Sequence, residues 1–167
     1  PQNLPPDYML KLQQSFKAAN GQKAALIGIP MGKRATGFSN SVLGFQPTRL
    51  ALSAPYQYDK HHLVPFGEFI PPFAQWFIDL MQMPLGAFNR SGLDQAPFYW
   101  QNQRWGLNIC YEDLFGEELA QRFTNAATAP TILVNLTNIA WFGNTIAIDQ
   151  HLNIAKLRSM ELARPSI

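Results

Sequence analysis

The spacing of hydrophobic and polar positions predicts a chain in which strands and helices are mixed. Short apolar runs bounded by Gly, Pro or polar residues are typical of strands. Such runs predict strands over residues 23–30, 40–45, 49–58, 96–101, 104–110 and 129–137. The first run, "KAALIGIP", is almost wholly apolar, which predicts a buried position in a sheet. The runs at 96–101 and 104–110 predict a hairpin, and those at 40–45 and 49–58 flank a turn at Pro47.

Apolar residues three and four positions apart predict helices between these strands. Asp7 is a candidate N-cap for the first helix, and Pro165 would end the last one. In the second helix, a proline stands at the start, and apolar residues follow the helical spacing. The predicted helices cover residues 5–21, 71–83, 117–127 and 147–164.

This mixture predicts one α/β (α+β) domain whose helices cover the faces of its sheets. A chain of 167 residues suffices for a sizeable core. No apolar stretch approaches the ~20 residues that span a bilayer. Because neither "PQNLPPDY" nor "ELARPSI" resembles a natural terminus, we expect the sequence to be a piece excised from a longer protein.

The composition argues against disorder and against nucleic-acid binding. Apolar residues make up 47% and charged residues only 14%, well below the usual charged share of about 25%. The net charge is +2, and no cluster of Lys and Arg forms an electrostatic footprint for nucleic acid. The single cysteine excludes an intramolecular disulfide.

Cys110, the only cysteine, ends an apolar run and precedes "YEDLFGEE", which has the pattern of a helix start. A lone cysteine is by default a small buried hydrophobic residue. At a strand-to-helix turn, however, nearby backbone N–H groups and the positive helix end favour a reactive thiolate. The Tyr111 N–H would then be placed to hold an oxyanion. Glu112 and Asp113 oppose ionisation of the thiol, so a nearby cation would have to offset them.

Lys60 is the candidate for that cation. Its ammonium would favour the thiolate and later stabilise an oxyanion, and such electrostatic help is typically worth ~3–4 kcal/mol. Glu68, after the turn at residues 65–67, could orient the lysine or handle a proton. The alternative is a solvated ion pair in a loop.

The three histidines indicate a metal site only weakly. His61 and His62 are adjacent, and adjacent side chains on a strand point to opposite faces. No second ligand shows helical spacing to His151.

The aromatic-rich segment at residues 66–88 leaves two interpretations open. It could pack in the core, or it could form an exposed apolar patch, which usually marks a partner or a membrane. Because the predicted helix is apolar on nearly every face, we favour partial exposure.

Three separated blocks carry a resemblance to a known family. They are "YDKHHLVPFGEFIP", "NICYEDLFGE" and "NLTNIAWFG" followed by "QHLNIAKLRSMELARP". Together and in this order they resemble apolipoprotein N-acyltransferases, whose nitrilase-superfamily (carbon-nitrogen hydrolase) domain lies on the outer face of the bacterial inner membrane. The resemblance runs from about Gly28 to the C-terminus. It implies a nitrilase-like αββα sandwich that is only partly present here.

The resemblance also implies roles for individual residues, with no cofactor and no metal. Cys110 matches the nucleophile, Lys60 the catalytic lysine, and Glu68 an additional essential glutamate of this branch. The matches to residues that flank the nucleophile or line the substrate site are Tyr111, Glu112, Trp141 and Phe142.

Two departures from the family pattern stand out. The general-base glutamate of the family lies upstream of the first helix, so no residue here is assigned that role. The membrane-embedded helices and the strands after "ELARP" are also expected to be absent. Ile139 stands where the family usually has Asp in "NDAWFG", which puts the fine positioning of that loop in doubt.

The activity implied is acyl transfer through a cysteine thioester. The acyl donor would be a phospholipid, and the acceptor would be the α-amine of a diacylglyceryl-cysteine apolipoprotein, at the periplasmic face of the membrane. One alternative is a soluble nitrilase-type amidase that acts on small amides. The other is a fragment that folds or binds without turnover.

Overall fold

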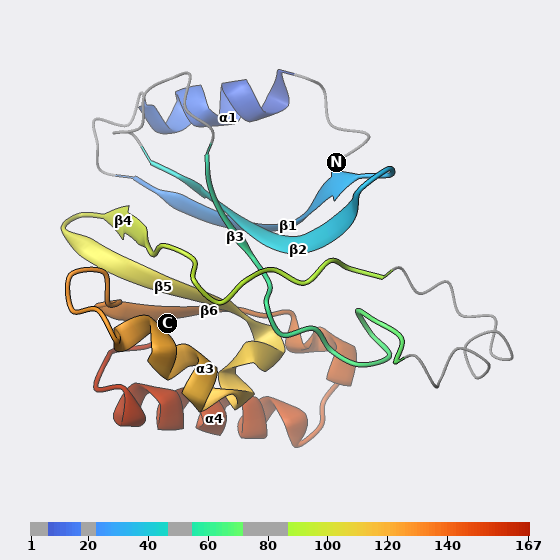
Figure 1. The fold of residues 1–167 in the computed structure, drawn as a ribbon, viewed down its shortest axis with the longest axis vertical. Coiled ribbons are helices and arrows are strands. Elements are labelled where there is room, and N and C mark those ends of the chain that lie inside the picture. The colour runs from blue at the N-terminus through green and yellow to red at the C-terminus, as the bar shows by residue number, and fades with distance from the viewer. Residues whose placement is uncertain (1–6, 18–22, 47–54, 72–86) are drawn as a thin grey trace, which may run out of the picture.

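The computed structural model describes residues 7–17, 23–46, 55–71 and 87–167 (Figure 1). In chain order the elements are α1 (Tyr8–Lys17), β1 (Ala25–Lys33), β2 (Gly37–Phe45), β3 (Tyr56–Asp59), β4 (Phe98–Trp100), β5 (Gln103–Ile109), the 3-10 helix η2 (Cys110–Leu114), α3 (Gly116–Ala120), the 3-10 helix η3 (Gln121–Phe123), β6 (Ile132–Leu136), the 3-10 helix η4 (Ile139–Phe142) and α4 (Ala147–Glu161).

The strands form two sheets. One has the order β1-β2-β3 with antiparallel neighbours, and the other has the order β4-β5-β6. In the second sheet β4 and β5 are antiparallel, whereas β5 and β6 are parallel. Residues 165–167 run beside β6, because the Leu133 N–H donates to the Pro165 carbonyl and the Asn135 N–H donates to the Ile167 carbonyl, both at 2.9 Å.

The elements stack in four layers, in the order helix, sheet, sheet, helix (Figure 1). Helix α1 lies outside the β1-β2-β3 sheet, and α3 and α4 lie outside the β4-β5-β6 sheet. This confirms the mixed α/β class and the αββα layering expected from the sequence.

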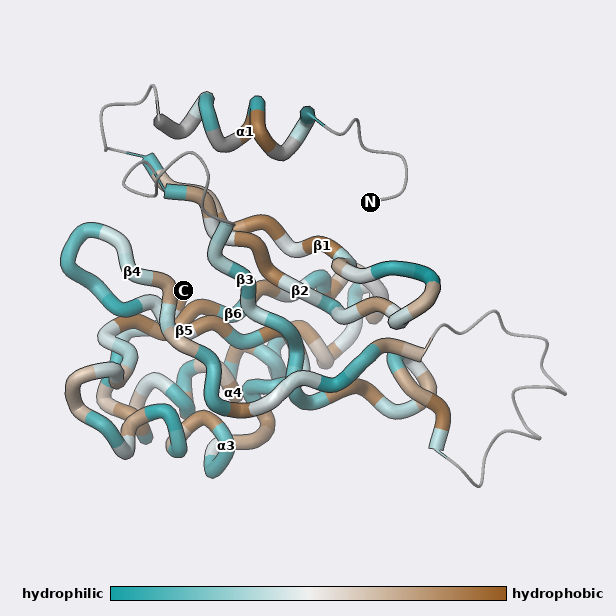
Figure 2. The backbone as a smooth tube through the Cα atoms, turned by 45° about the horizontal axis from the view of Figure 1, so that its top comes forward, coloured by the Kyte–Doolittle hydropathy of each residue, from teal (hydrophilic) through white to brown (hydrophobic). Residues whose placement is uncertain are grey.

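The hydrophobic core lies between the two sheets. Its buried members come from β2 and β3 on one side and from β4, β5 and β6 on the other: Val42, Tyr56, Tyr58, Phe98, Leu107, Ile109 and Val134. The tube is largely hydrophobic along β1 and hydrophilic along β3 and at the β1–β2 and β4–β5 connections (Figure 2). Burial of apolar side chains is worth about 25 cal/mol per Å², so this interface is what holds the sheets together.

The predicted hairpin is confirmed, and its turn has a clear local cause. Gln101 and Asn102 connect β4 to β5 with φ values of 48° and 59°. A two-residue turn with both φ values positive matches the twist of the flanking strands. This hairpin fixes the course of β5, which ends one residue before Cys110.

Two expectations were wrong in detail. The strand at 23–30 is not fully buried: β1 forms an edge of the described sheet, and Gly28 and Pro30 are exposed. The helix at 117–127 is shorter than predicted, since α3 ends at Ala120 and gives way to η3.

Some predictions fall outside the described residues. These are the strand residues 49–54, the turn at Pro47 and most of the helix at 71–83. Among the helices described, none is both long and apolar enough to cross a membrane.

Candidate active site

Lys60 follows the last residue of β3 and is almost completely buried, with 1% of its surface exposed. Its backbone N–H donates to the Asn40 carbonyl at 2.8 Å, which extends the β2–β3 pairing by one residue. Its ammonium lies 2.7 Å from the Glu68 carboxylate. Burial of a cation requires such a partner, so the alternative of a solvated ion pair in a loop was wrong.

Glu68 is itself held by three donors. Oε2 accepts from Lys60 Nζ and from the Val64 N–H at 2.8 Å, and Oε1 accepts from the Asn40 side chain at 2.7 Å. The turn between Val64 and Glu68 brings this carboxylate back toward the end of β3. Removing one partner of a buried ion pair leaves the charge of the other uncompensated. Lys60 and Glu68 therefore each stabilise the buried, charged state of the other.

Cys110 occupies a strained turn between β5 and η2. Its φ is +51°, in the left-handed region that residues other than glycine rarely adopt. The residue is half-buried and carries a free thiol. This geometry matches the predicted strand-to-helix nucleophile turn, in which the side chain is lifted out of the sheet.

Asn135 of β6 stabilises this turn. Its Oδ1 accepts from the Cys110 N–H at 3.1 Å, and its Nδ2 donates to the Cys110 carbonyl at 2.9 Å. The side-chain amide therefore satisfies both backbone groups of the residue at which the strand ends.

Glu112 connects the Lys60 segment to the Cys110 turn. Oε1 accepts from the His61 N–H at 2.7 Å and the His62 N–H at 3.1 Å. Oε2 accepts from the Ile109 N–H at 2.7 Å and from the Tyr58 hydroxyl at 2.8 Å. One buried carboxylate thus binds the residue after Lys60 and the residue before Cys110, which brings these two chain segments together.

Asp113 is also buried, and its carboxylate accepts from the Asn108 side chain. Burial raises the pKa of the Asp113 carboxyl, and hydrogen bonds from Asn135 and Asn108 oppose that change. A raised pKa favours the neutral form of the Asp113 carboxyl, the form that does not oppose ionisation of a nearby thiol.

The expected substrate-binding residues are placed as follows. Tyr111 is half-buried, and its ring centroid lies 5.8 Å from that of His62, next to the Lys60 segment. Phe142 is exposed in η4. Trp141 belongs to η4, but its side chain lies outside what the structure describes. In η4 Asn138 caps the turn by accepting from the Ala140 N–H, so the turn forms with Ile139 in place of the family's Asp.

His61 and His62 make structural contacts. His61 Nδ1 lies 2.5 Å from the Ser91 carbonyl, and the His62 ring stacks on Phe115 and pairs with Glu118. Within the described ranges, no group of three or more His, Cys, Asp or Glu residues could hold a metal ion.

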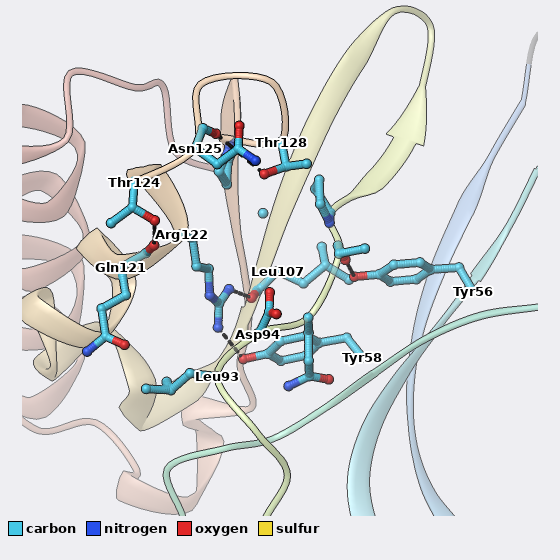
Figure 3. Close-up of a pocket in the computed structure, with 15 residues that line it drawn as sticks. Tyr56, Tyr58, Leu93, Asp94, Leu107, Gln121, Arg122, Thr124, Asn125 and Thr128 are labelled. Atoms are coloured by element: carbon cyan, nitrogen blue, oxygen red, sulfur yellow. Dashed lines mark hydrogen bonds between the residues drawn. The ribbon is translucent and has the colours of Figure 1, made fainter.

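A separate cleft of about 760 Å³ lies beside η3 (Figure 3). Its walls come from β3, β5, η3 and the segments around residues 93–97 and 124–130, and include Tyr58 and Arg122. Lys60, Glu68 and Cys110 are not part of its lining. The candidate site formed by Cys110, Lys60 and Glu68 is therefore distinct from this cleft.

Sequence reasoning missed Asn40, Tyr58, Arg122 and Asn135. Asn135 lies in the apolar run "ILVNL", and Tyr58 stands two residues before Lys60. A polar residue inside an apolar strand run is the signal that could have drawn attention to Asn135, because a buried amide needs partners.

Comparisons with known proteins identify the family of the chain. Residues 9–167 match the family model for carbon-nitrogen hydrolases. The chain is 59% identical over 167 residues to the apolipoprotein N-acyltransferase of Verminephrobacter eiseniae, covering all of this chain and 30% of that protein. It is 48% identical over 144 residues to that of Ralstonia nicotianae, covering 86% of this chain and 27% of that protein. The chain therefore spans less than a third of the length of these curated relatives.

The fold also has solved relatives. A carbon-nitrogen hydrolase from Helicobacter pylori aligns over 96% of this chain and 51% of its own, with a TM-score of 0.64 and 16% identity. The C. elegans NitFhit protein aligns over 96% of this chain and 36% of its own, with a TM-score of 0.66 and 17% identity. At these identities the likeness concerns the fold, and the family follows from the sequence match: this chain belongs to the carbon-nitrogen hydrolase family.

Proposed function

We propose that this chain is part of the catalytic domain of an apolipoprotein N-acyltransferase. The observation that carries the proposal is the buried Lys60–Glu68 pair. Hydrogen bonds to Glu112 connect the segment after Lys60 to the strained turn at Cys110, the candidate nucleophile. The similarity to apolipoprotein N-acyltransferases along the whole chain selects this branch of the family.

In the first half-reaction the Cys110 sulfur attacks an ester carbonyl of a phospholipid. A C–S bond forms, the ester C–O bond breaks, and the lysophospholipid leaves as an alcohol after it takes up a proton. Lys60 would stabilise both the thiolate and the oxyanion that develops, and Glu68 would keep the ammonium charged and oriented. The Tyr111 N–H is a second candidate donor to the oxyanion.

In the second half-reaction the α-amine of a diacylglyceryl-cysteine apolipoprotein attacks the thioester. A C–N bond forms, the C–S bond breaks, and the thiolate is restored. The amine must lose a proton, and the superfamily resemblance assigns that step to a glutamate upstream of α1. We propose that this base and the membrane-embedded helices belong to parts of the enzyme outside these 167 residues, with the domain at the periplasmic face of the inner membrane.

Acceptor chemistry separates this proposal from an amidase. The intact protein, at the length of its relatives, would be given a labelled phospholipid together with either a diacylglyceryl-cysteine peptide or small aliphatic amides. We expect label on the peptide amine and no hydrolysis of the amides. Hydrolysis of the amides with no transfer to the peptide would instead establish a soluble-type amidase activity.

A further inference from the structure

The buried Tyr58 and the half-buried Arg122, which the proposed mechanism does not use, form a chain of hydrogen bonds to Glu112. Arg122 of η3 donates from Nη2 to the Tyr58 hydroxyl at 2.7 Å (Figure 3). The Tyr58 hydroxyl lies 2.8 Å from Glu112 Oε2. Arg122 also donates from Nη1 to the Leu107 carbonyl, and its Cζ lies 5.1 Å from the centroid of the Tyr58 ring.

The direction of these bonds is fixed by chemistry. A guanidinium only donates hydrogen bonds, so the Tyr58 oxygen must accept from Arg122. The single phenolic proton is then free to be donated to Glu112. Burial raises the pKa of Tyr58, an effect that Arg122 opposes and Glu112 adds to. The phenol therefore keeps its proton and remains a donor throughout the range of an enzyme assay.

With Tyr58 included, Glu112 has a full set of donors. A carboxylate offers about four lone-pair sites, and the donors are the N–H groups of Ile109, His61 and His62 and the phenol of Tyr58. Glu112 is 4% exposed, and a buried carboxylate needs such compensation. Arg122 supplies a positive charge one side chain away.

We propose that Tyr58 and Arg122 are positioning residues for the acylation of Cys110. Arg122 orients the Tyr58 hydroxyl, and Tyr58 holds Glu112 in the position that ties the segment after Lys60 to the turn before Cys110. This inference rests on the proposed function and deepens it. Arg122 comes from the helical segment beyond Cys110, so the relay couples η3 to both sides of the active site.

Without the Tyr58 hydroxyl, Glu112 Oε2 would accept from the Ile109 N–H alone. We expect the carboxylate to shift, and with it the separation between the Lys60 ammonium and the sulfur. Misplacement of catalytic groups by about 1 Å can cost on the order of 10²-fold in rate. A cation farther from the sulfur also favours the thiolate less.

The test uses the intact protein with the variants Tyr58→Phe, Arg122→Met, Arg122→Lys and Tyr58→Phe/Arg122→Met. Tyr99→Phe and Gln121→Ala are the matched controls, because Tyr99 and Gln121 are exposed. The readouts are the pH profile of Cys110 alkylation by iodoacetamide, and the kcat and KM for a labelled phospholipid. Rates are expressed per folded protein, as measured by circular dichroism.

We expect Tyr58→Phe and Arg122→Met to lower kcat by about 10- to 100-fold with KM changed by no more than about twofold. The midpoint of the alkylation profile should move to higher pH. Arg122→Lys should retain more activity than Arg122→Met, because it keeps a donor. The double variant should be no slower than the slower single variant, because both act through one connection.

An unchanged alkylation profile in Tyr58→Phe would overturn the positioning role. A double variant whose loss in kcat equals the product of the two single losses would also overturn it, because the two residues would then act independently. The alkylation readout does not depend on acyl transfer. If the parent protein accepts no acyl group from phospholipid while Tyr58→Phe still moves the alkylation profile, the relay stands and the proposed function fails.

Discussion

Asn135 holds both backbone groups of Cys110 at the point where β5 ends. The Cys110 N–H donates to Oδ1 at 3.1 Å, and Nδ2 donates to the Cys110 carbonyl at 2.9 Å. Strand β6 runs parallel to β5 beside this turn. The Asn135 side chain on β6 therefore supplies the hydrogen bonds that a continued β5–β6 ladder would otherwise give to Cys110. The left-handed φ of Cys110 costs of order 1–3 kcal/mol, and this pair of bonds helps to offset that cost.

Asn135→Asp tests this arrangement. The variant keeps an acceptor for the Cys110 N–H but turns the Nδ2 donor into an oxygen that faces a carbonyl, and it adds a negative charge near the thiol. We expect the acylation rate to fall by about 10²-fold, as measured with a labelled phospholipid. Asn153→Asp, on the exposed face of α4, is the control and should keep the parent rate. A parent-like rate in Asn135→Asp would show that the pair of bonds is dispensable.

Lys60→Met removes the buried cation. We expect a loss of about 10²- to 10³-fold in acylation, because a preorganised charge near the oxyanion disappears. Glu68 would be left buried without its ion-pair partner, so the melting temperature should also fall, and rates are compared per folded protein. Lys33→Met, at an exposed position of β1, controls for the loss of a positive charge. Parent activity in Lys60→Met would remove this residue from the mechanism.

Gly44 and Gly28 test the packing between the sheets. A Cβ at Gly44 would lie 2.7 Å from the Phe98 ring and 3.0 Å from the Tyr56 ring, whereas a Cβ at Gly28 would meet nothing within 4 Å. Overpacking typically costs about 1–3 kcal/mol, so Gly44→Ala should lower the free energy of unfolding by that amount. Gly28→Ala should leave it nearly unchanged. Equal urea midpoints for the two variants would contradict the sheet-on-sheet contact.

The raised pKa of Asp113 predicts a pH dependence of stability. Burial favours the protonated carboxyl in the folded state, while in the unfolded chain Asp titrates near ~3.9. The folded protein then binds the proton more tightly, so this residue destabilises the fold increasingly as pH rises from about 4 through the folded pKa.

Asp113→Asn cannot ionise and should lack that decline. We expect its melting temperature relative to the parent protein to rise as the pH is raised from about 4 toward neutrality. Asp94→Asn, at an exposed carboxylate, should show no such trend. If the melting temperatures of the parent protein and of Asp113→Asn followed parallel curves with pH, ionisation of Asp113 would cost the folded state no stability.

The elements that the sequence predicted well are those with a local signal. The hairpin of β4 and β5 has two apolar runs and a two-residue turn, and the Cys110 turn has a cysteine between a strand pattern and a helix pattern. Lys60 and Glu68 are eight positions apart in one short segment, so their pairing could also be inferred from the sequence.

The contacts that the sequence could not predict join distant segments. Tyr58 and Glu112 are 54 positions apart, and Arg122 and Tyr58 are 64 apart. Neither pair has a spacing that a helix or strand period would bring together. Glu112 was expected to oppose the thiolate. In the structure its carboxylate accepts from three backbone N–H groups and the Tyr58 phenol. These contacts depend on how the two sheets pack, so the sequence alone could not predict them.

The most direct test of the account is whether Cys110 carries an acyl group. The intact protein would be incubated with a phospholipid bearing an isotope-labelled acyl chain, without acceptor, and then digested and analysed by mass spectrometry. We predict an acyl adduct on the peptide that contains Cys110, removable by neutral hydroxylamine and absent from Cys110→Ala. A label found on another residue, or an unmodified Cys110 in a protein that still transfers acyl groups to the acceptor, would contradict it.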